Sequence, residues 1–465
     1  MTGLVWFRRD LRLDDNPAWA AATTGHETVA ALYVLDPRLL AAAGPHRRAR
    51  LEAEVAALDV ALAERGGRLL VRTGDPVTVV PAEAARLGAA HTYWNADVSP
   101  YATRRDQQVA QALPDGGVTT TWGTLVLPPG SVRTGEGRVH RVFGAFHRAW
   151  RATAWDPWPE PGAATVLEDP GDGPPAVPGD AGLEAGLEGD GTGVGTAAAV
   201  DQLHRFLADG VDRYPASRDD VGLGARGGGG TSALSVALRF GTLSPRHVVS
   251  TTGDATAGRE AFVRQLAWRD WFAHLLHESP ELVHHAQRRE LDAIRWLDDP
   301  EDLAAWQDGR TGFPLVDAGM RELRATGAMH NRVRMVAASF LVKDLLVDWR
   351  HGERHFRRLL TDADPAQNMG NWQWVAGTGP DAAPYFRVFN PVTQSRTHDA
   401  GGHYLRRWVP ELAGLDDRAI HAPWEAPPLE LAAAGVTLGE TYPFPIVDHA
   451  LARHRALAAY AEARA

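Results

Sequence analysis

The chain has 465 residues, enough for two or three domains, and its 44% hydrophobic and 23% charged residues are typical of a soluble globular protein. It contains no cysteine, which excludes disulfides and thiolate catalysis. The net charge of −10 gives no sign of nucleic-acid binding, although a local basic groove is enough for that function. Without a signal-peptide pattern or a run of about 18 apolar residues, the chain is expected to be cytoplasmic.

Residues 1–130 alternate short apolar runs with amphipathic stretches, which predicts an α/β domain with a doubly wound, Rossmann-like parallel sheet. The predicted strands are 4–7, 29–35, 68–72, 91–94 and 118–122, and the predicted helices are 47–65, 76–87 and 100–113. The first strand-to-helix turn, FRRDLRLDDNP, lacks a Gly-x-Gly-x-x-Gly phosphate loop, so we expect no ordinary dinucleotide site there. Asp15 or Asn16, before Pro17, is the predicted N-cap of the helix that follows.

The composition changes after the predicted sheet. Residues 131–200 are predicted to be an interdomain linker, because 156–200 are rich in Pro, Gly and Asp and show little periodicity. Residues 201–465 show helical periodicity with almost no strand signal, which predicts an all-α domain. Strongly apolar helices are expected at 262–276 and at 335–346.

Tryptophan is unusually abundant, with 16 residues against 8 tyrosines. For any single buried tryptophan, core packing is the simplest explanation. Trp349, Trp372 and Trp374 nevertheless share the stretch 329–394 with an arginine-rich segment and an Asp-Ala-Asp-Pro turn. Trp372 and Trp374 are two residues apart on one predicted helix and point to different faces, so one can serve an electron path and the other a binding pocket.

The strings MHNRVRM, DADPAQN and WQW in this stretch, with TSALS (231–235), resemble the photolyase/cryptochrome family and in particular class I CPD (deoxyribodipyrimidine) photolyases. The resemblance covers nearly the whole chain and implies an antenna domain at 1–130 and a helical FAD-binding catalytic domain at 201–465. It implies a blue-light-driven carbon-carbon lyase, in which reduced FAD donates an electron to a cyclobutane pyrimidine dimer flipped out of DNA. The implied partner is damaged DNA, and we expect a monomer without a membrane partner or a metal site.

The resemblance also assigns the flavin site. FAD is assigned to Tyr214, Thr231, Ser232, Ala233, Leu234, Ser235, Arg334, Asp362, Ala363, Asp364 and Asn368. Thr231 and Ser232 lie where a loop becomes a helix, which suits a phosphate, although a plain N-cap is the alternative. Asp362 is expected to pair with Arg334 beside the flavin ring, and Asp364 to bond the flavin or its ribityl chain. Asn368 is expected to face flavin N5, which favours a repair enzyme.

Two further sets follow from the resemblance. The electron relay that photoreduces FAD is assigned to Trp296, Trp349 and Trp372. The DNA and lesion site is assigned to Arg218, Gln265, Trp268, Asn331, Arg332, Met335, Trp374 and Gln394. Trp268 and Trp374 are expected to stack on the flipped bases, and Arg218 and Arg332 to pair with phosphates.

Gln265 departs from the CPD photolyase pattern, which usually has glutamate at this position. Glutamine can donate to a thymine carbonyl, but it supplies neither a carboxylic proton nor a negative charge. Animal cryptochromes and (6-4) photolyases also carry glutamine here, although they usually have histidines in the segment that is MHNR in this chain. A cryptochrome-like photoreceptor and a (6-4) photolyase therefore stay open as alternatives. A light-independent flavin oxidoreductase is disfavoured, because no nicotinamide-type motif is present.

The string WNADVSPYATRRD (94–106), together with Arg47, resembles family members that carry a second, light-harvesting pigment. The resemblance places Arg47 and Asp97 near the ring of 8-hydroxy-deazaflavin. Methenyltetrahydrofolate is the less favoured pigment, because its usual residues are not evident. The remaining alternative is a capped turn that binds nothing.

Overall fold

The computed structural model describes residues 1–168, 193–225, 229–381 and 387–464. The middle of the predicted linker, 169–192, lies outside the described residues. The chain divides into two compact units. The first comprises Met1–Val211, Ser232–Pro280 and Thr361–Ala366, and the second comprises Asp212–Thr231, Glu281–Leu360 and Gln367–Ala465. These units differ from the predicted domains, because residues 201–211, 232–280 and 361–366 of the predicted helical domain belong to the unit that contains the sheet.

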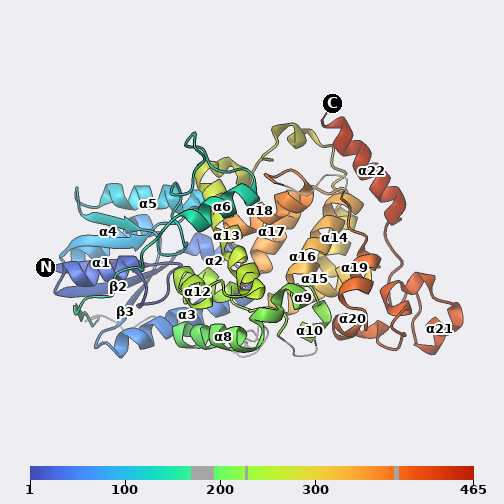
Figure 1. Ribbon diagram of the computed structural model, residues 1–465, viewed down its shortest axis with the longest axis horizontal. Helices are drawn as coiled ribbons and strands as arrows, with labels where there is room; N and C mark the ends of the chain where they lie inside the picture. Colours follow the sequence, from blue (N-terminus) through green and yellow to red (C-terminus); the bar gives the residue numbers. More distant parts are fainter. Residues whose placement is uncertain (169–192, 226–228, 382–386, 465) are drawn as a thin grey trace. The chain divides into compact units, whose positions relative to one another are not determined.

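A parallel sheet forms the centre of the first unit, as predicted (Figure 1). Its strands are β1 (Thr2–Phe7), β2 (Thr28–Leu35), β3 (Leu69–Thr73), β4 (Ala89–Asn95) and β5 (Val118–Thr121). They lie in the order β3-β2-β1-β4-β5, and all neighbouring pairs are parallel. The chain adds β2 and β3 on one side of β1 and then β4 and β5 on the other, so the switch point of the sheet lies between β1 and β4. In α/β sheets such a switch point is where ligands usually bind.

Four helices cover the two faces of this sheet (Figure 1). They are α1 (Pro17–Gly25), α3 (Pro45–Ala63), α4 (Pro76–Arg86) and α5 (Pro100–Ala112). Trp19 of α1 and Leu58 of α3 pack in one core with Phe7, whereas Val80 of α4 and Val109 of α5 pack in the other. Asn16 is the N-cap of α1, since its side chain accepts hydrogen bonds from two backbone N–H groups of the first turn.

The first unit has further elements besides these strands and helices. They are α2 (Pro37–Ala42), α6 (Phe143–Ala152), β6 (Thr165–Val166), α8 (Gly195–Asp209), α11 (Ser235–Phe240), α12 (Pro245–Thr252) and α13 (Ala257–Glu278). Both α6 and β6 fall within 131–200, so the predicted linker contains folded structure. Phe143, Phe146 and Trp150 are buried at helical spacing on α6, which precedes the Pro/Gly-rich residues 156–200 on which the linker prediction rested.

The second unit is helical, as predicted. Its α-helices are α9 (Tyr214–Ser217), α10 (Val221–Ala225), α14 (Pro300–Asp308), α15 (Pro314–Thr326), α16 (Asn331–Ser339), α17 (Trp349–Leu359), α18 (Pro365–Ala376, whose first two residues belong to the first unit), α19 (Pro391–His398), α20 (His403–Trp408), α21 (Pro428–Ala433) and α22 (His449–Glu462). The helix expected at 335–346 consists of two parts: the second half of α16, which ends at Ser339, and the π-helical turn η4 (Phe340–Asp344) that follows it. Within the described part of the chain, no helix is both long and apolar enough to cross a membrane.

Candidate functional site

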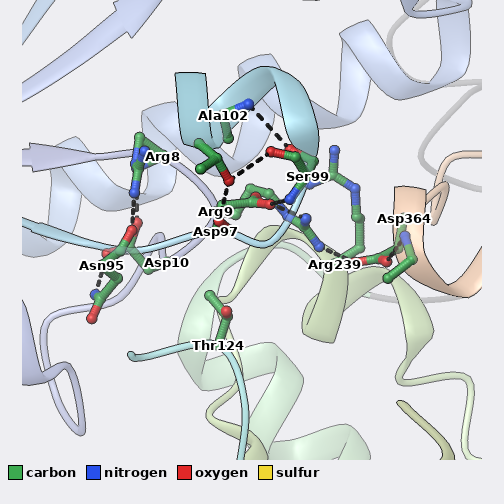
Figure 2. Close-up of polar contacts among 12 residues, drawn as sticks. Arg8, Arg9, Asp10, Asn95, Asp97, Ser99, Ala102, Thr124, Arg239 and Asp364 are labelled. Carbon is green, nitrogen blue, oxygen red and sulfur yellow. Dashed lines mark hydrogen bonds and ion pairs between the residues drawn. The ribbon is translucent and has the colours of Figure 1, made fainter. Parts of the chain in front are cut away.

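Two arginines hold the Asp-Ala-Asp loop in the first unit. Arg9, just after β1, forms ion pairs with Asp364 of this loop and with Asp97, just after β4 (Nη1–Oδ2 3.0 Å), as Figure 2 shows. Arg239 of α11 donates a hydrogen bond to the carbonyl of Ala363. The structure therefore brings Arg239, which follows the TSALS segment on α11, and the acidic loop together beside the switch point of the sheet.

The charges around this loop are strongly coupled. Burial acts to lower the pKa of Arg9, but the charges of Asp364 and Asp97 outweigh it and raise that pKa. Burial acts to raise the pKa of Asp97, but Arg9 outweighs it and lowers that pKa. Burial, and then repulsion by Arg9, lower the pKa of Arg239 to about 9. Excess guanidinium charge thus favours an anionic or acidic group beside Arg239.

The predicted antenna residues belong to this neighbourhood. Arg47 is 9% exposed and donates to the carbonyl of Ala42 at 3.0 Å. Its charge lowers the pKa of Arg239, whereas Asp97 raises it, so both predicted residues act on the same guanidinium. Arg9 and Arg239 were not predicted, because an arginine in a turn or helix does not indicate its distant partner.

The TSALS segment begins its helix later than predicted. Helix α11 begins at Ser235, its N-cap is Leu234, and no side chain among the described residues caps it. Ala233 has a positive φ of 52°, an uncommon backbone conformation for alanine. The carbonyl of Ser232 accepts a hydrogen bond from Gln202 Nε2 at 3.1 Å. The plain N-cap alternative for Ser232 is therefore wrong, while the assignment of these residues to FAD stays a prediction.

Asn368 is held in one orientation on α18. It is 8% exposed, and its Nδ2 donates to the backbone carbonyl and to Oε1 of Glu353, both at 2.9 Å. Burial raises the pKa of Glu353, and Arg357, 3.5 Å away, acts against this rise. Because Glu353 takes both Nδ2 contacts, Oδ1 of Asn368 is directed away from Glu353. Glu353 was not predicted from the sequence.

The three predicted relay tryptophans belong to the second unit. Trp349 (1% exposed) and Trp372 (3%) are buried, whereas Trp296 is partly exposed. Trp372 makes an edge contact with Trp306, with ring centroids 6.2 Å apart, and Trp296 makes one with Tyr460 at 6.1 Å. Trp306 has no distinguishing motif in the sequence.

Trp268 rests on a second aromatic ring in the first unit. The Trp268 and Phe143 rings stack with centroids 3.7 Å apart and planes 14° from parallel. Trp268 remains partly exposed, so it presents apolar ring surface on a rigid support. One turn earlier on α13, Gln265 donates through Nε2 to the carbonyl of Ala261 at 3.2 Å. Phe143 was not predicted, since its partner lies more than a hundred residues away.

The other predicted lesion residues belong to the second unit. Asn331, Arg332 and Met335 share α16, and Nδ2 of Asn331 lies 3.8 Å from the Met335 sulfur. Trp374 lies on α18 and Gln394 on α19. Among the described residues, Arg332 Nε and Gln394 Oε1 are buried without a hydrogen-bond partner. Buried polar atoms are nearly always paired, so these two atoms fit a polar ligand.

Several predicted pairs join residues of different units. Asp362 and Trp268 belong to the first unit, whereas Arg334 and Trp374 belong to the second. The ion pair of Asp362 with Arg334 and the pairing of Trp268 with Trp374 around a lesion therefore stay predictions. The same is true of Tyr214 and Thr231, which the unit division separates from Ser235.

Comparisons with known proteins cover nearly the whole chain. The DNA photolyase family profile matches residues 3–162, and the profile of the FAD binding domain of DNA photolyase matches residues 262–462. The deoxyribodipyrimidine photo-lyase of Escherichia coli (strain K12) is 40% identical over 481 residues, which is 100% of this chain and 99% of the relative.

Solved structures agree with the sequence relatives. A bacterial class III photolyase from Agrobacterium tumefaciens superposes with a TM-score of 0.91 at 38% identity, covering 100% of this chain and 98% of that one. A cryptochrome from Synechocystis sp. PCC6803 superposes with a TM-score of 0.89 at 29% identity, covering 98% of each chain. The chain therefore belongs to the DNA photolyase family and carries that family's FAD-binding domain.

Proposed function

We propose that this protein splits cyclobutane pyrimidine dimers in DNA under blue light, with an electron supplied by reduced FAD. The observation that carries the proposal is the 40% identity to a deoxyribodipyrimidine photo-lyase over the full length of both chains. The alternatives are (6-4) repair and a cryptochrome-like receptor. The experiment below tests both alternatives, because of Gln265 and the likeness to a solved cryptochrome.

The residues of the chain fit a flavin. When bound, FAD supplies light absorption and one-electron donation. Nδ2 of Asn368 is held by Glu353, so its Oδ1 is free to accept a hydrogen bond from the N–H of a reduced flavin ring. Arg9 and Arg239 hold the Asp-Ala-Asp loop, to which Asp362 belongs. The pairing of Asp362 with Arg334 beside the flavin ring is part of the proposal.

We assign Trp372, Trp349 and Trp296 to flavin photoreduction. Two buried indoles followed by a partly exposed one suit a path that ends near solvent. Indole is among the side chains most easily oxidised, so closely spaced rings pass a hole without any proton donor.

Lesion binding is assigned to stacking and phosphate contacts. Trp268, supported by Phe143, and Trp374 stack on the flipped base pair, while Gln265 donates to thymine carbonyls. Arg332 and Arg218 bind the phosphate backbone of the DNA. The dimer is split after positioning and electron donation, and the electron returns, so these side chains need no general base.

The antenna assignment extends the proposal. The charges of Arg47 and Asp97 both act on the Arg239 guanidinium, and Asp97 follows β4 at the switch point of the sheet, where α/β domains bind ligands. We assign this place to 8-hydroxy-deazaflavin, whose anionic ring would be stabilised by the guanidinium groups. Titration of the purified protein with this pigment checks the assignment through quenching of pigment fluorescence, which Arg47→Gln should weaken.

The proposal is tested with two synthetic oligonucleotides, one with a thymine dimer and one with a (6-4) photoproduct. Each is mixed with flavin-reduced protein, in blue light and in the dark. Light-dependent conversion of the thymine dimer alone supports the proposal. Conversion of the (6-4) lesion alone assigns the other repair activity, and conversion of neither, with reducible flavin bound, points to a receptor.

A further inference from the structure

A carboxylate occupies the two arginines that are assigned to DNA phosphates. Asp219 accepts a hydrogen bond from Arg332 Nη2 at 2.5 Å, and its other oxygen lies 3.8 Å from Arg218 Nε. All three residues belong to the second unit. The side chains are 33%, 18% and 29% exposed for Asp219, Arg332 and Arg218, so DNA can reach the cluster from solvent.

Asp219 is ionised in this cluster. Burial acts to raise its pKa, but the hydrogen bond from Arg332 and the charges of Arg332 and Arg218 outweigh burial and lower it. Burial lowers the pKa of the neighbouring His398, and that of His330 to about 4, so both rings are neutral at neutral pH. The local charge balance is therefore set by two guanidinium groups and one carboxylate.

The two arginines differ in their other contacts. The Arg218 guanidinium lies over the Tyr214 ring, 5.3 Å from its centroid. Arg332 Nε is buried and has no hydrogen-bond partner in the described structure, although its Nη2 is bonded to Asp219. A phosphate oxygen that displaced the carboxylate would find a donor ready at this nitrogen.

We propose that Asp219 stands in for a DNA phosphate on Arg332 and Arg218 in the free protein, so that the DNA backbone must displace it. The inference rests on the proposed function, in which these two arginines bind DNA. Because a tethered carboxylate already neutralises them, fewer solution ions are released when DNA binds. Asp219 thus lowers the affinity for undamaged duplex and makes it less dependent on salt, which speeds release from DNA without a lesion.

The test measures the dissociation constant of holoenzyme for undamaged duplex DNA across a series of salt concentrations. Asp219→Asn should bind roughly 3- to 10-fold more tightly and steepen the slope of log affinity against log salt by about one. Asp212→Asn is the matched control, because it removes the same charge from an exposed side chain of the same segment and should change affinity less than about twofold.

Weaker or unchanged binding by Asp219→Asn would overturn the inference, because the carboxylate would then only orient the arginines. Asp219→Ser decides the question in the same way if the asparagine variant loses its flavin. Arg332→Gln and Arg218→Gln separate the assignment of these arginines to DNA from the role of Asp219. If both bind DNA as tightly as the wild type, the DNA assignment of these arginines fails; if they weaken binding while Asp219→Asn does not tighten it, the inference about Asp219 alone fails.

Discussion

Arg9 joins residues that lie far apart in the sequence. Its guanidinium forms ion pairs with both Asp97 and Asp364, and Asp364 belongs to the loop assigned to FAD. Arg9→Gln removes the charge-assisted contacts, each worth about 1.5–3 kcal/mol when largely buried. We expect a roughly tenfold loss of flavin affinity, measured as flavin released on dilution.

A comparable surface arginine provides the control for Arg9. Arg65 pairs with Asp14 at 2.6 Å, but both side chains are well exposed. Arg65→Gln should retain flavin as the wild type does, because exposed ion pairs contribute little. Equal flavin retention by Arg9→Gln and Arg65→Gln would contradict the positioning role of Arg9.

Trp372 and Trp306 provide a second comparison between residues. Both rings are buried and in contact, but only Trp372 is assigned to the relay. Trp372→Phe should slow flavin photoreduction at least about tenfold, because a phenyl ring is much harder to oxidise, whereas repair by chemically reduced protein should persist. Trp306→Phe should leave photoreduction near the wild-type rate. The reverse pattern in a steady-illumination assay would move the relay to Trp306.

At the scale of elements, close packing of α17 against Trp372 requires a glycine. A Cβ added to Gly352 would lie 2.1 Å from Trp372 Cη2 and 2.6 Å from Leu341 Cδ2. Gly352→Ala should therefore destabilise the fold by about 1–3 kcal/mol, although alanine is the better helix former. The measurement is chemical denaturation of the variant beside the wild type.

Gly144 of α6 is the matched helical position for this test. A Cβ there would meet nothing closer than Arg148 Nη1 at 4.0 Å, so Gly144→Ala should be neutral or stabilising by up to about 1 kcal/mol. If the two alanine variants were equally stable, Gly352 would not be needed for packing against Trp372.

Local sequence signals predicted the elements well and their distant contacts poorly. The strand pattern of the first 130 residues and the Asn16 cap are confirmed, because apolar alternation and capping act over a few residues. Arg239 at Ala363, Phe143 beneath Trp268 and Glu353 at Asn368 were missed. Each of these contacts depends on tertiary folding, about which local periodicity carries no information.

At the scale of the whole molecule, one buried lysine makes stability depend on pH. Lys343, in η4, is 1% exposed, donates to the carbonyl of Ala376 at 3.0 Å, and burial lowers its pKa from 10.5 to about 7. The pKa of Lys343 is lower in the folded state than in the unfolded state, so the protein is most stable at a pH above the unfolded-state pKa. As the pH falls from the unfolded-state pKa toward the folded-state pKa, the free energy of unfolding decreases by about 1.4 kcal/mol per pH unit.

Lys343→Met tests this dependence. The variant loses the hydrogen bond at every pH but removes the titration, so the stability of the wild type relative to the variant should fall as the pH drops from about 10 to about 7. Denaturant midpoints across this range check the prediction. Parallel curves for the two proteins would show that Lys343 does not titrate in this range.

Each compact unit is built from several separate segments of the chain, which the sequence did not predict. The resemblance predicted consecutive domains, yet Ser232–Pro280 and Thr361–Ala366 pack with the sheet unit. The contacts of Arg239 and Arg9 with the acidic loop account for the second of these segments. Family membership, by contrast, followed from the sequence, because short strings such as MHNRVRM and DADPAQN carry it.

We expect light to drive dimer splitting by an electron that returns to the flavin, with no net redox change. The most direct measurement counts dimers split by pre-reduced holoenzyme under blue light, with no reductant present and oxygen excluded. Many dimers should be split per flavin, with the flavin still reduced at the end and none split in the dark. If one dimer or fewer were split per flavin and the reduced flavin were lost, the electron would not return to the flavin. Equal splitting in the dark would show that the reaction is not driven by light.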